Sequence, residues 1–586
     1  MRIKRSALAL LMFMLMFSSS VSGAALPEKS PSTKGEENRR TIQEIKKSEL
    51  DKQYNKTDIV RVIVEMKTEP SVLYAQKQNK KYKELPDATK QKLKNEKLSE
   101  QQKVKDRAKK NKVKMIERES FTTIVNGFSA EMMYGDIELV KEMPEVAEVQ
   151  VVNEYEKPQE KPDMLYSKEL VQAQEAWRDY GFKGEGMVVG VIDTGMDPSH
   201  RDMVLAGETE KELTKAEISK FKKDNGVLGK YYSEKVPYGY NYMDENDTIR
   251  DIGPDASMHG MHVAGTVGAN GDEENGGIKG VAPEAQILAL KVFGNDPNMP
   301  STYSDIYVKA IDDAIVLGAD VLNMSLGSTA GFVSPESAEQ KAIARAVENG
   351  ILMSISAGNS AHFGNGFANP SSENPDIGVS GSPGVSYDSL QVASIENTFM
   401  DLDAVNYQFG EESGKAAFLS AGNVHPNDVE TKTFEVAYGG LGKPEELSSV
   451  AGKYALIQRG ELAFVDKAIN AQKAGALGVI IYNNADGYVN MASDPSITIP
   501  QLFMLKTDGD KLAAAIQDGQ TVTLSFNGEK TKSANPEAGK MSAFTSWGLT
   551  PNLDFKPEIT APGGQIYSTL ENNQYGMMSG TSMAAP

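Results

Sequence analysis

Short runs dominated by apolar residues recur between positions 187 and 395. They are Met187–Ile192, Ile287–Phe293, Val321–Leu326, Ile351–Ser356 and Leu390–Ile395. Strands buried on both faces of a parallel sheet have this pattern, whereas strands with one wet face alternate apolar and polar residues. Helix-prone stretches, such as 304–317 and 335–348, lie between the runs. The alternation of strand and helix predicts an α/β domain built on a parallel sheet.

Residues from about 57 to 156 have a different pattern. Residues 58–64 alternate apolar and polar positions, residues 77–114 are polar and helix-prone, and 121–132 and 146–152 predict further strands. This order predicts a small α+β unit. Pro158–Pro162 (PQEKP) then predicts a linker.

The stretch from about 402 to 538 interrupts the α/β pattern. Apolar runs at 454–458, 477–482 and 501–505 flank a helical stretch near 465–474. Domains of about 50–250 residues are common, so this stretch can form a domain of its own. Residues 539–586 again have the pattern of strands and turns, which indicates that the α/β domain continues after an insertion.

The two ends of the chain carry separate signals. Residues 1–25 predict a signal peptide, because basic residues precede an apolar stretch from Ala7 to Phe17 and small residues follow it. That stretch is too short to cross a bilayer, which takes about 20 residues. We therefore expect a secreted, extracellular protein with no transmembrane segment in this chain. The sequence stops at Pro586 inside GTSMAAP, so we expect a C-terminally truncated piece, with any cell-wall anchor beyond it.

Composition narrows the function classes. The net charge of −19 argues against a nucleic-acid-binding protein, whose binding surface would be basic. The chain has no cysteine, which excludes disulfides, thiol catalysis and iron–sulfur clusters. It has only five histidines, so a His-rich metal centre is not expected.

Four polar residues stand where parallel sheets present reactive groups, at strand ends or helix starts. Asp193 and Asn359 follow apolar runs, and His259 and Ser582 begin stretches of small residues that permit tightly packed helices. Together they offer a carboxylate, an imidazole, a hydroxyl and an amide, the groups that nucleophilic catalysis with an oxyanion donor requires.

Each of these residues also has an ordinary interpretation. Asp193 could cap a turn, His259 could be a satisfied core histidine, and Asn359 could be a turn residue after a glycine. A Gly-Thr-Ser tripeptide around Ser582 is weak by itself. We interpret His262, one helical turn after His259, as structural.

The order Asp, His, Ser is that of subtilisin among the triad proteases. Residues 190–195 (GVIDTG), 259–266 (HGMHVAGT) and 580–586 (GTSMAAP) resemble the three signature blocks of the subtilisin-like serine proteases, the S8 family of subtilases. Residues 323–327 (NMSLG) and 356–359 (SAGN) resemble two further blocks. The resemblance covers roughly residues 165–586.

Two features resemble one branch of that family. Met261, where Thr is commoner, is similar to the lactocepin and C5a-peptidase-like branch. Residues 458–460, 473–476 and 480–484 of the insertion resemble a protease-associated (PA) domain, which that branch carries before the nucleophile block. Residues about 57–156 resemble the inhibitory propeptide of these proteases.

The resemblance implies an architecture. It implies a signal peptide over 1–25, a propeptide over 26–160, a peptidase domain over 165–400 and 539–586, and a PA domain over 402–538. The expected fold is a subtilisin-like parallel sheet with helices on both faces, joined by a mainly-β insert and a small α+β propeptide.

The resemblance also implies roles for single residues. Ser582 would be the nucleophile, His259 the general base, Asp193 the group that orients His259, and Asn359 the oxyanion donor. The remaining expected contacts with substrate come from Ser325, Leu326, Gly327, Ala357 and Gly358. The expected partners are protein or peptide substrates and the chain's own propeptide.

Alternatives stay open at this point. The chain could be a catalytically silent scaffold that binds proteins, particularly because only four residues follow Ser582. An esterase could use the same triad. We expect no metal in the catalytic site and no cofactor. The oxygen-rich loop Asn270–Gly277 (NGDEENGG) could bind calcium, as family members often do nearby, or could be a solvated turn.

Overall fold

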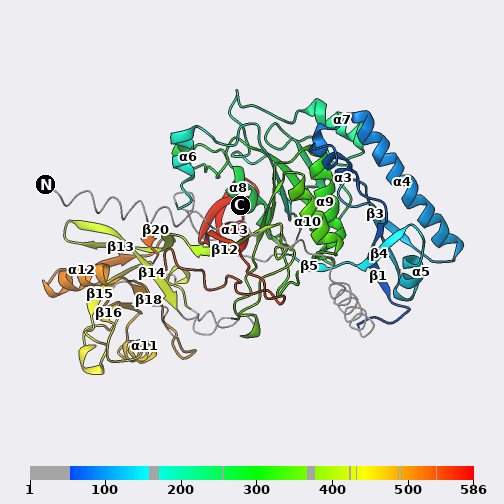
Figure 1. Ribbon diagram of the computed structural model, residues 1–586. Coiled ribbons are helices and arrows are strands. Elements are labelled where there is room, and N and C mark those ends of the chain that lie inside the picture. Colours follow the sequence, from blue (N-terminus) through cyan, green and yellow to red (C-terminus); the bar gives the residue numbers. More distant parts are fainter. Residues whose placement is uncertain are drawn as a thin grey trace, which may run out of the picture. The chain divides into compact units, whose positions relative to one another are not determined.

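The computed structural model describes residues 53–586 apart from 158–169, 254–255, 366–375, 422–423, 430–431, 486, 490, 492 and 536 (Figure 1). The signal peptide predicted at 1–25 and the linker predicted at 158–162 lie outside these described residues. Among the helices that are described, none is both long and apolar enough to cross a membrane.

The N-terminal part of the chain forms a four-stranded sheet in the order β2-β3-β1-β4. Its strands are β1 (Ile59–Met66), β2 (Ile116–Phe121), β3 (Gly127–Met133) and β4 (Val146–Val151). Its helices are α3 (Ser71–Gln76), the long α4 (Asp87–Lys110) and α5 (Ile137–Lys141). The single strand expected over 121–132 is wrong in its first half, because residues 122–126 form the connection from β2 to β3.

The central sheet has seven strands in the order β21-β12-β11-β10-β6-β8-β7, and all neighbours pair in parallel. This confirms the predicted α/β fold with a parallel sheet. The strands are β6 (Val188–Asp193), β7 (Tyr238–Asn241), β8 (Gln286–Lys291), β10 (Val321–Met324), β11 (Leu352–Ser356), β12 (Leu390–Glu396) and β21 (Ile559–Gly564).

Both faces of the central sheet are buried, which explains the apolar runs. Side chains alternate between faces along a strand, so Val188 and Ile192 of β6 join the cluster with α9 (Ser304–Leu317) and α10 (Ala338–Glu348). Val189 and Val191 join the opposite cluster with α8 (His259–Gly268). Two further helices belong to this part of the chain: α6 (Ala173–Tyr180) precedes β6, and α7 (Lys215–Asn225) lies between β6 and β7 in the sequence.

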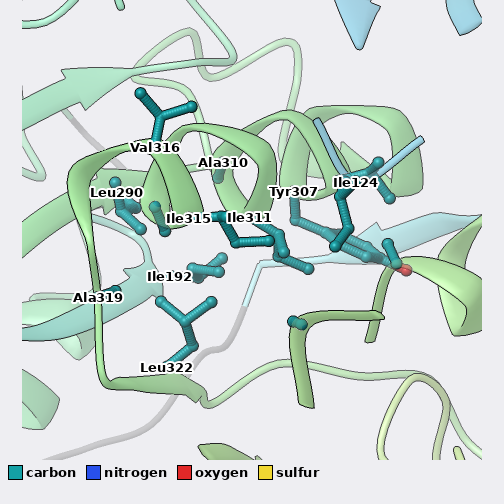
Figure 2. Packing of buried hydrophobic residues seen from close by; sticks show 14 of the residues in the cluster. Ile124, Ile192, Leu290, Tyr307, Ala310, Ile311, Ile315, Val316, Ala319 and Leu322 are labelled. Atoms are coloured by element: carbon teal, nitrogen blue, oxygen red, sulfur yellow. The ribbon is translucent and has the colours of Figure 1, made fainter. Parts of the chain in front are cut away.

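The cluster around α9 also contains residues from the N-terminal part. Ile124 is fully buried in the same cluster as Tyr307 and Ile311 of α9 and Ile192 of β6 (Figure 2). The connection from β2 to β3 therefore contributes to the core of the central sheet domain.

The inserted stretch builds an eight-stranded sheet in the order β14-β18-β17-β16-β15-β19-β13-β20, and a further pairing of β13 with β14 closes it. It buries two hydrophobic clusters drawn only from residues between 405 and 526. Its strands and helices are β13 (Phe399–Phe409), β14 (Glu412–Ala421), β15 (Thr433–Tyr438), β16 (Tyr454–Gln458), α11 (Phe464–Lys473), β17 (Gly478–Tyr482), β18 (Gln501–Met504), α12 (Lys506–Gln517), β19 (Thr523–Ser525) and β20 (Lys530–Ala534).

Five small elements, two pairs of strands and one helix, complete the described fold. Strands β22 (Ile566–Leu570) and β23 (Gln574–Met578) form an antiparallel hairpin. The last helix, α13 (Thr581–Ala584), follows that hairpin. Strand β5 (Glu154–Glu156) pairs antiparallel with β9 (Ser301–Tyr303).

Candidate active site

Asp193 and His259 form a fully buried pair. Asp193 is the last residue of β6 and His259 the first residue of α8. His259 Nδ1 lies 2.7 Å from Asp193 Oδ1, and neither side chain is exposed to solvent. The same carboxylate oxygen accepts a hydrogen bond from the main-chain N–H of Thr194 at 2.6 Å. A carboxylate in this position fixes the orientation of the imidazole ring.

Glycine at two positions of α8 lets neighbouring segments approach closely. A Cβ atom on Gly260 would lie 2.5 Å from the carbonyl oxygen of Gly195, so only glycine fits beside the loop that follows Asp193. A Cβ atom on Gly265 would collide with Thr569 of β22. The main-chain N–H of Gly260 also donates to Thr194 Oγ1 at 2.9 Å, which ties the helix start to the strand end.

Ser582 lies in α13, whose N-cap is Gly580. Helix α13 contacts α8 and three strands of the central sheet, β11, β12 and β21. The Ser582 hydroxyl donates to the main-chain carbonyl of Ser325 at 3.4 Å, and Ser325 Oγ donates to the Ser582 carbonyl at 2.7 Å. The structure thus brings the candidate nucleophile to the helix that carries His259.

Asn359 is held by Thr581, the neighbour of Ser582. Its side-chain oxygen Oδ1 accepts hydrogen bonds from Thr581 N at 2.9 Å and from Thr581 Oγ1 at 3.0 Å. With Oδ1 engaged in this way, Nδ2 is the end of the amide that can donate to a ligand. The tie places Asn359 one residue from the candidate nucleophile, although 222 residues separate it from Thr581 in the chain.

The residues expected to contact substrate divide into two groups. Ser325, Leu326 and Gly327 follow β10 directly and reach the region of Ser582 through Ser325. The main-chain groups of Ala357 bond to Val392 and Gly381. The N–H of Gly358 donates to Thr581 Oγ1, and its carbonyl accepts from Ser546 N. Ala357 and Gly358 therefore have internal partners that position Asn359 and Thr581.

His262 is a structural residue, as predicted. Its Nε2 lies 2.8 Å from the carbonyl oxygen of Ile566 and 3.1 Å from that of Gly576, so it joins α8 to the β22–β23 hairpin. Burial lowers the pKa of His262 to about 3. The ring is therefore neutral at ordinary pH.

The loop Asn270–Gly277 uses its central carboxylate internally. Asp272 Oδ1 accepts from the main-chain N–H of Glu274 at 3.1 Å, and Asp272 Oδ2 accepts from Asn275 Nδ2 at 2.6 Å. Across the described residues, no group of three or more His, Asp or Glu side chains stands close enough to hold a metal ion. Calcium binding at this loop remains a prediction.

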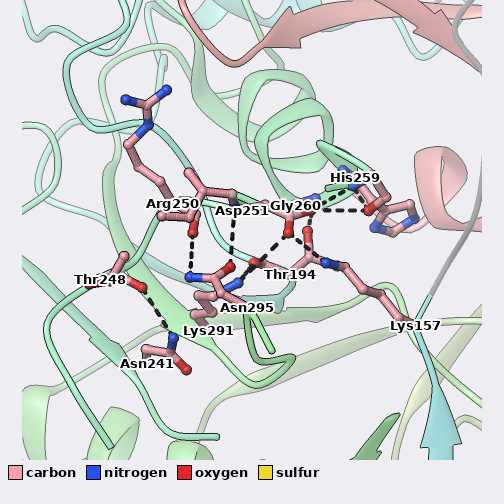
Figure 3. A network of polar contacts seen from close by, with 12 residues as sticks. Lys157, Thr194, Asn241, Thr248, Arg250, Asp251, His259, Gly260, Lys291 and Asn295 are labelled. Carbon is pink, nitrogen blue, oxygen red and sulfur yellow. Dashed lines mark hydrogen bonds and ion pairs between the residues drawn. The ribbon is translucent and has the colours of Figure 1, made fainter. Parts of the chain in front are cut away.

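A second buried acid lies beside the start of α8, and sequence reasoning missed it. Asp251 Oδ2 accepts from the main-chain N–H groups of Ser257 and Met258 at 2.9 and 3.1 Å. Asp251 Oδ1 lies 2.5 Å from Lys157 Nζ and 3.9 Å from Lys291 Nζ (Figure 3). An Asp eight residues before His259 suggests a helix cap, but nothing local to it points to Lys157.

Lys157 reaches Asp251 because the preceding strand runs along β9. Tyr155 of β5 is opposite Thr302 of β9, and the N–H of Lys157 donates to the carbonyl oxygen of Pro300 at 3.0 Å. The last described residues of the N-terminal part thus lie as an added strand within reach of the helix that carries His259.

Comparisons of the chain with known proteins give several matches. The subtilase family (Peptidase_S8) matches residues 184–586. The PI-type proteinase of Lactococcus lactis subsp. cremoris is 40% identical over 485 residues, which are 80% of this chain and 25% of that protein. The C5a peptidase of Streptococcus pyogenes is 35% identical over 412 residues, 69% of this chain and 34% of that protein.

A solved structure, the psychrophilic subtilisin-like protease Apa1 from Pseudoalteromonas sp. AS-11, is 21% identical with a TM-score of 0.37, and the match covers 61% of this chain and 81% of that one. The chain spans about a quarter of the length of the lactococcal proteinase and about a third of the C5a peptidase.

Proposed function

Since the chain belongs to the subtilase family, we propose that it is a serine endopeptidase that hydrolyses peptide bonds of proteins through Asp193, His259 and Ser582. The observation that carries the proposal is the fully buried 2.7 Å contact between His259 Nδ1 and Asp193 Oδ1. Helix α13, which carries Ser582, contacts the helix that begins at His259.

The proposed reaction has two halves. Ser582 Oγ attacks the carbonyl carbon of the scissile peptide, and His259 Nε2 takes the hydroxyl proton and then gives it to the leaving amine. An acyl-enzyme remains on Ser582 until water, deprotonated by the same nitrogen, releases the second product. Asp193 holds the Nδ1–H of His259 and stabilises the imidazolium that forms in each half.

The negative oxygen of each tetrahedral intermediate needs donors. Asn359 Nδ2 and the main-chain N–H of Ser582 are proposed to supply them. The hydrogen bonds from Thr581 to Asn359 Oδ1 support this role, because they fix the amide before substrate arrives.

Residues 26–160 are proposed to be a propeptide that occupies the cleft until it is cut off. The pairing of β5 with β9 supports this proposal. Three further contacts tie the N-terminal part to α9 and α10. Asp312 Oδ1 accepts from Thr123 N and Ile124 N at 2.9 and 2.7 Å, and Glu65 Oε2 lies 2.8 Å from Lys341 Nζ.

Two proposals rest on the sequence. The chain is exported by residues 1–25, and residues 402–538 form a PA domain. None of the proposed catalytic steps passes through a cofactor.

The test is the intact mass of residues 26–586 beside the same chain with Ser582→Ala. We expect the wild-type chain to be cut near residues 155–165 and the variant to stay whole. Ser579→Ala is the matched control, because it removes a hydroxyl from the same segment without touching the triad, and it should still be cut.

Two results would contradict the proposal. If the Ser582→Ala chain is cut as fast as the wild type, another protease makes the cut. If neither chain is cut and neither degrades an unfolded protein, this chain is not a competent peptidase, and a truncated protease and a silent protein-binding scaffold are the two interpretations left; restoring a C-terminal helix decides between them.

A further inference from the structure

Residues 154–157 lie in the body of the protein as a short extended segment. Strand β5 pairs with β9 along Glu154–Glu156, and the N–H of Lys157 continues the ladder to the carbonyl of Pro300. Because side chains alternate along an extended segment, Tyr155 and Lys157 are buried while Glu154 and Glu156 are exposed. Added strands of this kind gain affinity from main-chain hydrogen bonds and selectivity from pockets for alternate side chains.

The pocket for Lys157 ends in a fixed carboxylate. Only 6% of the Lys157 side chain is exposed and none of the Asp251 side chain is. Asp251 Oδ2 is committed to the N–H groups of Ser257 and Met258, so Oδ1 is the oxygen that faces the pocket. The carboxylate is therefore held in place by the main-chain N–H groups that directly precede α8.

The charges around this pocket favour a cation in it. Lys291 is 3.9 Å from the same oxygen, but its ammonium group donates to the Thr194 carbonyl. Burial lowers the pKa of Lys291 to about 8, and the carboxylates that oppose this effect are Asp251, Asp244 and Asp193. With Lys157 absent, Lys291 at 3.9 Å would be the cation left beside Asp251 Oδ1, and a buried carboxylate that loses its close partner is costly.

The pocket for Tyr155 is also built to recognise its side chain. The Tyr155 hydroxyl donates to Glu339 Oε2 at 2.7 Å and accepts from the Tyr307 hydroxyl at 3.2 Å. The two rings meet edge to face with centroids 5.5 Å apart. Both the polar tip and the aromatic body of a tyrosine have partners here.

We propose that this groove binds the substrates of the processed enzyme, and that Asp251 and Glu339 make it select an extended segment with a tyrosine and, two residues later, a lysine. The inference rests on the proposed peptidase function, because the propeptide must leave the groove before a substrate can enter it. Residues 154–157 then occupy the groove in the manner of a substrate, with Lys157 in the position that selects for charge.

The test maps cleavage sites in a mixture of unfolded proteins by mass spectrometry, with the processed wild-type enzyme and with Asp251→Asn. For the wild type we expect lysine to be enriched about 10-fold or more at one fixed position before the cut, and tyrosine two residues before the lysine. In Asp251→Asn the lysine enrichment should fall to background. Asparagine keeps an oxygen that can accept from Ser257 and Met258, and each enrichment is calculated within one variant's own cuts.

Glu339→Gln is the matched control for the second pocket. It should reduce the tyrosine preference and leave the lysine preference in place, which a general loss of activity would not do. A measurement on the wild type alone repeats the test if either variant fails to fold. The best peptide from the map is compared with versions in which its lysine is replaced by methionine or by glutamate. With methionine, kcat/KM should fall about 10-fold or more. With glutamate, which adds a like charge beside Asp251, it should fall further.

The outcomes separate the two proposals. Cuts without lysine enrichment, equal enrichment in Asp251→Asn, or equal rates for the lysine and methionine peptides would overturn the inference and leave the peptidase function standing. Preference for arginine over lysine would also overturn the assignment of lysine. If the wild type makes no cuts beyond those of Ser582→Ala, the proposed function fails and the inference falls with it.

Discussion

Two buried acid–base pairs flank the start of α8, and they differ in origin. Asp193 and His259 come from adjacent elements of the central domain, with both side chains fully buried. Asp251 is equally buried, but its closest cation, Lys157, comes from the N-terminal part, 94 residues before it in the chain. The first pair lies within the central domain, whereas the second is completed by a segment that the proposed maturation removes.

The difference in origin suits the two pairs to different tasks, the first to catalysis and the second to the selection of substrates. A pair within one rigid body can hold an imidazole in place through every turnover, because no ligand has to supply either member. A carboxylate whose partner leaves becomes a binding site for the next cation of the right shape. In the two proposals, the same physical element, a buried ion pair, serves reactivity in one place and recognition in the other.

The largest expected effect breaks the pair within the central domain. In Asp193→Asn the amide no longer holds His259 in the required tautomer, and kcat should fall about 10⁴-fold while the fold persists. Hydrolysis of an unfolded protein measures the rate, and a thermal melt checks the fold. Hydrogen exchange at Tyr155 and Lys157 should stay unchanged, since Asp251 is untouched. A loss smaller than tenfold in a folded variant would show that the pair does not serve catalysis.

The next largest effect concerns the side-chain amide of Asn359, which Thr581 of the central domain holds in place. Asn359→Ala removes the proposed oxyanion donor, and kcat should fall about 10²–10³-fold with little change in KM. Asn359→Asp is the informative companion, because it keeps an acceptor for Thr581 but lacks the amide donor. The two variants should lose rate to a similar extent. An unchanged kcat in both would remove Asn359 from the mechanism.

The third prediction breaks the pair that spans the two parts. Lys157→Met in the Ser582→Ala chain leaves Asp251 without its closest cation, and the N-terminal part should be held less tightly by about 2–3 kcal/mol. Hydrogen exchange of residues 146–157 measures the change. Lys77→Met is the control, since its pair with Glu69 is exposed and should contribute less than about 1 kcal/mol. Equal exchange in the two variants would contradict the comparison.

The smallest effect is a pH dependence at the contact of β2 with α9. Burial raises the pKa of Glu119 to about 7, with Asp313, Asp305 and Glu245 adding to the shift and Lys309 opposing it. A carboxyl whose pKa is raised by folding binds its proton more tightly when folded, so stability is lost as pH rises from about 4.5 to 7. Glu119→Gln should stabilise the chain by about 1 kcal/mol at pH 8 and change little at pH 4.

Urea unfolding of the Ser582→Ala chain with and without Glu119→Gln, at both pH values, checks this prediction. A stabilisation of the same size at pH 4 would show that ionisation of Glu119 is not its cause.

Much of the fold could be predicted from the sequence because its signals are local. The runs dominated by apolar residues marked strands β6, β8, β10, β11 and β12, since a strand covered on both faces has no wet side that would alternate with the apolar one. The helix expected over 304–317 coincides with α9. The strand expected over 121–132 was partly wrong, because Ile124 and Val125 are apolar for the core they enter and not for a strand.

The candidate site also has a part that local sequence signals predict and a part that they do not. By itself, the sequence predicted Asp193, His259, Asn359 and Ser582 as the reactive set, because they lie in short motifs that resemble the signature blocks of the subtilases. Only the tertiary structure decided that Lys157 meets Asp251 and that Tyr155 meets Glu339. A buried charge chooses its partner by position in space, and the local pattern around Asp251 holds no information about a lysine that β5 brings alongside β9.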